Sequence, residues 1–119
     1  MKYTQDHEWL RVEGDLIVVG ITEHAATQLG DVVFVELPEV EAMVGEGDEV
    51  VVIESVKAAS DILAPIDGEI VEVNDKLTDK PGLVNDDPLG AGWFFKMKVD
   101  DMTVIDQFMD EDEYIDMIG

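Results

Sequence analysis

Lys57 stands between two strand-like runs in a chain that holds few basic residues. The run before it, Val50 to Ile53, is entirely β-branched, and the run after it, Ile62 to Pro65, is short and apolar, so the pattern predicts a hairpin over 50–64. The small residues Ala58 to Ser60 leave space around the lysine at the predicted tip. An amine that points away from the core can be reached and acylated by a large partner, so Lys57 is a candidate attachment point; the plainer interpretation is a solubilising surface charge.

The rest of the chain offers little chemistry of its own. It has no cysteine, which excludes a disulfide scaffold, a thiolate metal site and a cysteine nucleophile, so any dithiol chemistry would have to come from an attached group. The two histidines, His7 and His24, lie far apart in the sequence, have no evident nucleophile partner, and are interpreted as structural or surface residues. There is no P-loop and no Gly-x-Gly-x-x-Gly motif. These absences disfavour a stand-alone enzyme.

The chain is strongly acidic. It carries 7 Lys and Arg against 29 Asp and Glu, a formal charge of −22. Nucleic acids and anionic membranes both attract basic surfaces, so neither is an expected partner. The plainer interpretation is that the charge keeps the protein dispersed; the alternative is that it steers the protein toward basic patches on partner enzymes, and a salt-rich habitat would also fit. Apolar runs of about five residues fall far short of the roughly twenty of a spanning helix, and we expect a cytoplasmic protein, or a mitochondrial matrix protein only if a transit peptide has been removed.

The elements that would position Lys57 are mostly short strands. The length suits a single domain over 1–119, and short β-rich runs separated by glycine-containing turns favour a sandwich or barrel. Thr22 is a suitable N-cap for a short helix near 23–29, with Gly30 just beyond its end. Apolar residues at helical spacing predict a helical C-terminal segment over about 103–118. Strands are expected at 16–19, 32–35, 50–54, 70–73 and 93–99.

The residues around Lys57 resemble the lipoyl-lysine motif of the glycine cleavage system H protein family. The likeness continues in order along nearly the whole chain, so it rests on more than one motif. The segments that carry it are His7-Glu8-Trp9, Gly20 to Ala25, Leu29 to Pro38, Glu54 to Asp61, Ala64 to Asn74, Pro81 to Asn85 and Pro88 to Trp93.

This resemblance implies a mainly β fold of the lipoyl/biotinyl type, a hammerhead or barrel-sandwich hybrid of two small sheets. It implies lipoate joined to Lys57 as an amide, on a carrier subunit that is not itself an enzyme. It also implies a cleft into which the loaded arm folds back. The acids that match the family's motifs there are Glu8 and Asp61, both able to hydrogen-bond an amine.

The resemblance also implies a set of partners. The carrier would take an aminomethyl group from a pyridoxal-phosphate glycine decarboxylase to a tetrahydrofolate-dependent aminomethyltransferase. It would pass electrons to dihydrolipoamide dehydrogenase. A lipoate ligase, or an octanoyl or lipoyl transferase, would attach the group.

Several alternatives share part of this pattern. They are an H-protein-like lipoyl carrier for sulfur metabolism or lipoate relay, a lipoyl domain of a 2-oxoacid dehydrogenase, and a binding module with an unmodified lysine. Phe95 to Lys98 bears a slight likeness to the Met-Lys-Met motif of biotin carriers. Its two lysines fall inside an expected strand, and we interpret that strand as an edge strand with alternating charge.

Overall fold

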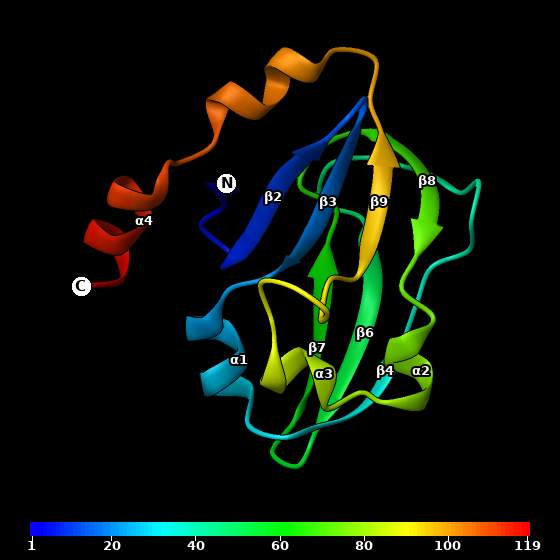
Figure 1. The fold of residues 1–119 in the computed structure, drawn as a ribbon, viewed down its shortest axis with the longest axis vertical. Coiled ribbons are helices and arrows are strands. Elements are labelled where there is room, and N and C mark those ends of the chain that lie inside the picture. Colours follow the sequence, from blue (N-terminus) through cyan, green and yellow to red (C-terminus); the bar gives the residue numbers. More distant parts are fainter.

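The computed structural model describes residues 1–119 as two antiparallel β-sheets with short helices around them. The larger sheet has six strands in the order β1-β2-β3-β9-β8-β5, and the smaller has three in the order β4-β6-β7 (Figure 1). The strands of the larger sheet are β1 Lys2–Tyr3, β2 Glu8–Glu13, β3 Leu16–Ile21, β5 Met43–Val44, β8 Gly68–Val73 and β9 Phe95–Lys98. Those of the smaller sheet are β4 Val32–Glu36, β6 Glu49–Ser55 and β7 Ala59–Leu63.

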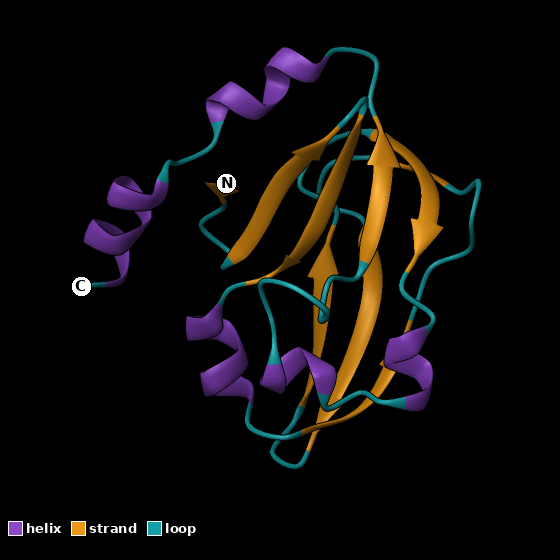
Figure 2. Cartoon of the chain, in the orientation of Figure 1, coloured by secondary structure: helices purple, strands orange, loops and turns teal.

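The two sheets share one apolar core. On β6, Val51 and Ile53 are buried while the intervening residues are more exposed, which is the two-residue period of a strand with one covered face. The central strand β3 is buried from Ile17 to Ile21. Figure 2 shows the strands running along the long axis of the molecule and the helices gathered at its lower end and along one side. The predicted mainly β fold of two sheets is therefore confirmed.

The helix expected near 23–29 is present as α1 Glu23–Leu29. Thr22 caps it by accepting a hydrogen bond from the Ala25 amide, and Gly30 ends it with a positive φ of 76°. The sequence does not predict two single-turn helices, α2 Lys76–Asp79 and α3 Leu83–Asp86. They are too short to show helical periodicity in sequence, and each is held by one buried side chain, Leu77 or Val84.

The helical C-terminal tail is confirmed as two pieces rather than one. The first is the 3₁₀ helix η1 Met102–Gln107, and the second is α4 Glu111–Ile118. Asp110 and Glu113 form a reciprocal capping box that starts α4. Between the two pieces, Met109 forms an antiparallel bridge with Tyr3, which fastens the tail to the N-terminal strand.

The expectation that Phe95 to Lys98 forms an edge strand is wrong. β9 lies between β3 and β8 in the larger sheet. Its Lys96 is largely covered and pairs with Glu72 of the neighbouring strand β8 at 3.7 Å and with Glu13 of β2, which lies beyond β3, at 2.8 Å. The ion pairs of Lys96 account for a lysine inside the sheet, whereas Lys98, at the end of β9, is exposed and belongs to no salt bridge. None of the helices has the length and apolar character that a membrane-spanning helix requires.

Candidate functional site

The lysine that the sequence singles out lies at the tip of the β6–β7 hairpin. Ser55 shapes the tip, because its Oγ accepts hydrogen bonds from the amides of Lys57 and Ala58, both at 3.2 Å. The Ser55 amide in turn donates to the Ala58 carbonyl at 2.9 Å. Lys57 is exposed and its ammonium belongs to none of the salt bridges of the molecule. The structure therefore presents a free primary amine on a turn fixed by its own hydrogen bonds.

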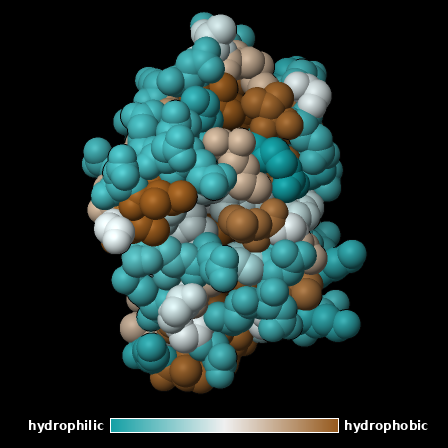
Figure 3. All heavy atoms as spheres, turned by 60° about the vertical axis from the view of Figure 1, so that its left-hand side comes forward, coloured by the Kyte–Doolittle hydropathy of each residue, from teal (hydrophilic) through white to brown (hydrophobic).

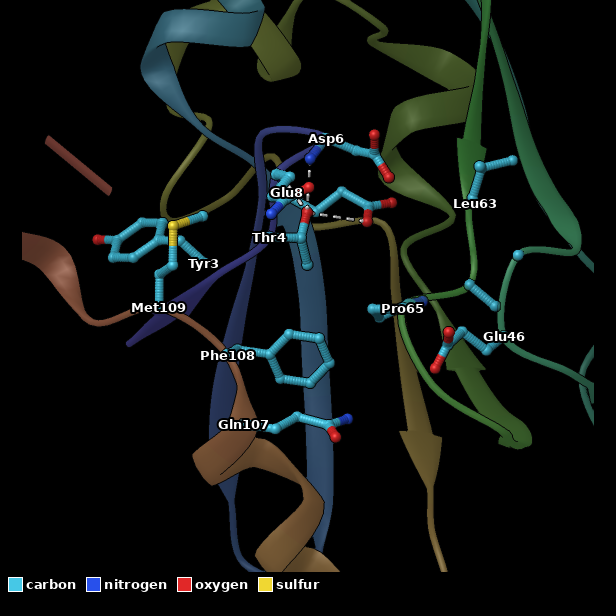
Figure 4. Close-up of a pocket in the computed structure, with 13 residues that line it drawn as sticks. Tyr3, Thr4, Asp6, Glu8, Glu46, Leu63, Pro65, Gln107, Phe108 and Met109 are labelled. Carbon is cyan, nitrogen blue, oxygen red and sulfur yellow. Dashed lines mark hydrogen bonds between the residues drawn. The ribbon is translucent and has the colours of Figure 1, made fainter. Parts of the chain in front are cut away.

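A second feature is a cavity of about 480 Å³ at the far end of β7 from Lys57. Its walls come from the N-terminal segment, the end of η1 with the bridge that follows, and the chain after β7. Figure 4 shows Tyr3, Phe108 and Met109 on one side and Leu63 and Pro65 on the other. The carboxyl group of Glu8 lies among them. The cavity thus has a mixed lining, to which Gln5, Asp6, Glu46 and Gln107 also contribute polar groups, and Glu8 is its one buried acid.

Glu8 is only 2% exposed, and its hydrogen bonding is incomplete. Its Oε1 accepts a bond of 3.3 Å from the Thr4 hydroxyl, whereas its buried Oε2 has no partner. Burial, and secondly the negative charge of Asp6, raise the pKa of Glu8 from 4.5 to about 8. The side chain is consequently a neutral acid near pH 7, with one oxygen free to meet a ligand.

Asp61 lies elsewhere. It is an exposed residue of β7, opposite Val52 of β6, and is not among the residues that line the cavity. Because side chains two apart on a strand point to the same side, Asp61 shares a face with Leu63, which does line the cavity. The structure therefore places Glu8 inside the cavity and Asp61 along the strand that joins it to the hairpin tip.

Nothing in the sequence indicates that its two histidines meet. The rings of His7 and His24 lie 4.8 Å apart, and His7 Nδ1 is 2.8 Å from the Tyr114 hydroxyl of α4. Burial, and secondly the neighbouring His24, lower the pKa of His7 below 6.5. No group of three or more potential ligands forms a metal site. The contacts of His7 are structural, and they hold the tail.

An unpaired lysine at the tip of a hairpin, on a fold of two antiparallel sheets, is the arrangement of a lipoyl-type carrier domain. Comparison with known proteins specifies it further. The family model described as glycine cleavage H-protein matches residues 1–119. The chain belongs to this family of lipoyl carriers, which are carrier subunits of the glycine cleavage system.

Individual relatives agree along the whole chain. The chain is 53% identical over 118 residues to a glycine cleavage system H protein of Xanthobacter autotrophicus, covering 99% of this chain and 94% of that protein. It is 55% identical over 114 residues to one of Methylocella silvestris, covering 96% and 91%. A crystal structure of a glycine cleavage system H protein from Mycobacterium marinum superposes with a TM-score of 0.89 at 40% identity, over 99% of this chain and 95% of that chain.

Proposed function

We propose that this protein is the lipoyl carrier of the glycine cleavage system, with lipoate attached as an amide to Lys57. The observation that carries the proposal is the exposed, unpaired Lys57 amine on the Ser55-fixed hairpin tip. The family membership of the whole chain supports it. A lipoate ligase, or an octanoyl or lipoyl transferase, would carry out the attachment.

When attached, the lipoyl group supplies a dithiolane that accepts an aminomethyl group and two electrons, which a chain without cysteine cannot do. The chain itself performs no catalysis. It serves glycine decarboxylase, the tetrahydrofolate-dependent aminomethyltransferase and dihydrolipoamide dehydrogenase in turn. Its physical contribution is tethering, because an arm on a fixed turn replaces free diffusion by a high local concentration. The named relatives are bacterial, which supports a cytoplasmic location.

The cavity around Glu8 fits the second part of this function, which is shelter for the amine cargo. Its apolar residues Leu63, Pro65 and Phe108 suit a hydrocarbon arm, and the partnerless Oε2 of Glu8 suits an amine. An arriving amine would find the carboxyl group able to give up its proton and form a charge-assisted hydrogen bond. β7 spans about 13 Å between Ala59 and Leu63, at roughly 3.3 Å per residue, and Asp61 stands midway along it.

The attachment is tested by intact mass and peptide mapping of protein from a host that lipoylates its own proteins. We expect a lipoyl increment on the peptide that contains Lys57. Lys57→Arg keeps the charge and should lose the increment with an unchanged melting temperature, whereas Lys98→Arg, the matched change at another exposed lysine, should keep it. An unmodified Lys57 in such a host would contradict the proposal.

The choice of pathway is tested by reconstitution. We expect the lipoylated protein to restore glycine cleavage to a mixture of the other components that lacks its carrier. Failure to do so would favour an H-protein-like carrier of sulfur metabolism, a lipoate relay or a 2-oxoacid dehydrogenase type of lipoyl domain.

The role of the two acids is tested by the lifetime of the loaded carrier. We expect Glu8→Ala and Asp61→Asn to speed the release of ammonia from carrier loaded with aminomethyl cargo and then freed of enzymes. Asp79→Asn, at an exposed acid on α2, should leave the rate unchanged. Equal rates in all four proteins would exclude the shelter.

A further inference from the structure

The backbone of Gly30 lies directly against the side chain of Lys57. A Cβ built on Gly30 would stand 3.1 Å from Lys57 Cε and 3.3 Å from Cδ. The position also has a φ of 76° and a ψ of −166°, a conformation that residues with side chains rarely adopt. Gly30 therefore provides a bare surface along which the methylene stem of the lysine lies, while the ammonium remains unpaired.

A single side chain holds this glycine in place. Asn85 of α3 donates from Nδ2 to the Gly30 carbonyl at 2.7 Å, and its Oδ1 accepts from the Val32 amide at 2.8 Å. A longer contact of 3.5 Å reaches the carbonyl of Ala26, in the middle of α1. A donor and an acceptor of one amide group thus hold the loop on both sides of Asp31, at Gly30 and at Val32, and Asn85 is itself anchored through its buried neighbour Val84.

The same loop is joined to the hairpin tip through the backbone. The amide of Val56 donates to the Asp31 carbonyl at 3.0 Å. In Figure 1 the tip lies next to the connection from α1 to β4, below α3. Asn85 is therefore linked to Lys57 by two routes, the stem contact through Gly30 and the backbone bond through Asp31.

We propose that Asn85 is a positioning residue for Lys57: by clamping Gly30 and Asp31, it sets the direction in which the amine is presented to the enzyme that acylates it. The inference rests on the proposed function. An unrestrained lysine has many rotamers, and ordering it in an enzyme site carries a cost in conformational entropy. A stem that already lies along a fixed backbone lowers that cost and holds the amine near the attack geometry.

The test measures kcat/KM for lipoylation by a lipoate ligase supplied with lipoate and ATP, well below the melting temperature of every variant. Asn85→Ala should lower kcat/KM about tenfold, a modest loss for a misplaced reacting group. Asn85→Asp keeps the acceptor for Val32 but loses the donor to Gly30, so it should show a similar loss. Acetylation of Lys57 by acetic anhydride should stay the same, because a small reagent does not need a fixed stem.

Two matched controls separate positioning from general destabilisation. Asn74 donates two bonds to loop carbonyls, at 2.7 and 2.8 Å, but has none with the Gly30 loop, so Asn74→Ala should lower stability without lowering kcat/KM. Gly30→Ala places a methyl group against Lys57 and should lower kcat/KM. Gly14→Ala, also at a positive φ, meets nothing within 4 Å and should not.

The outcomes are distinct. Loss of lipoylation in Asn85→Ala, Asn85→Asp and Gly30→Ala alone supports the proposal. Wild-type rates in both Asn85 variants, with Lys57 of the wild type modified, would overturn the positioning role and leave the proposed function standing. A wild-type protein that the ligase never modifies would overturn the proposed function and the positioning role together.

Discussion

At the scale of single residues, Glu8 shows how environment sets the state of a carboxyl group. Burial raises its pKa to about 8, so the folded protein holds a proton that the unfolded chain releases above pH 4.5. Between these two values, rising pH favours the unfolded chain, and stability falls. Glu8 is therefore a destabilising residue at neutral pH, which is common for groups retained for a ligand.

We expect Glu8→Gln to stabilise the protein near pH 7 and to have little effect near pH 4. Glutamine keeps the acceptor for Thr4 and removes the ionisation, which corresponds to about 3 kcal/mol at pH 7. The measurement is the melting temperature of both proteins as a function of pH. Asp61→Asn, which removes one exposed carboxylate, serves as the control, and an equal shift in the two variants would argue against a raised pKa of Glu8.

His7 gives a second prediction at this scale. Burial, and secondly the ring of His24, lower its pKa below 6.5, so His7 destabilises the folded protein as pH falls below that value. His24→Gln removes only the second cause, and we expect the pKa of His7 to rise partway toward 6.5. A titration of the His7 ring signals by NMR measures it. An unchanged pKa would mean that burial alone accounts for the shift.

At the scale of elements, the C-terminal tail is fastened at two points. The bridge between Tyr3 and Met109 holds the middle of the tail, and Tyr114 holds α4. The Tyr114 hydroxyl lies 2.7 Å from Thr22 Oγ1 as well as 2.8 Å from His7, and its ring stacks on Tyr3. Because the tail also forms a wall of the Glu8 cavity, its attachment bears on the site.

We expect Tyr114→Phe to loosen α4 and to lower the free energy of unfolding by about 1–2 kcal/mol. The change removes the hydroxyl that pairs with His7 and Thr22, and the buried Thr22 cannot replace this partner with water. Amide hydrogen exchange should accelerate over 111–118. Tyr3→Phe is the matched control, because the Tyr3 hydroxyl contacts only the sulfur of Met1, at 3.7 Å. Equal protection of α4 in all three proteins would show that the stacked rings alone hold it.

At the scale of the whole molecule, charge is the dominant property. The formal charge is −22, and the molecule has only three salt bridges, which involve two acids and two bases. Most of the 29 acidic side chains are therefore unpaired. Figure 3 shows a face on which hydrophilic residues predominate and apolar patches are scattered. Repulsion among unpaired carboxylates opposes the compact state.

We therefore expect the melting temperature to rise by several degrees between low ionic strength and about 0.5 M NaCl, where the Debye length is only a few ångströms. KCl should act equally, because the effect is screening. A melting temperature that is constant or falls with added salt would show that the acids are too widely spaced on the folded surface to repel one another.

The sequence by itself determined the local elements and the candidate attachment residue. The β-branched run before Lys57 and the Thr22 cap of α1 act over a few residues, so their signals are complete within the sequence. The family likeness likewise needs only the order of motifs. The short helices α2 and α3 depend on contacts with residues distant in the chain, and so does the position of β9 inside the larger sheet. No local sequence pattern indicates them.

Only the tertiary structure decided how the site is built. The pKa of Glu8 is raised because the tail and the chain after β7 bury its side chain. The sequence alone does not show which of the 29 acidic side chains will be desolvated in this way. The same holds for Asn85, which reaches Gly30 across 55 residues. Desolvation and side-chain hydrogen bonds depend on proximity in space, and proximity between distant segments is set by the packing of the two sheets.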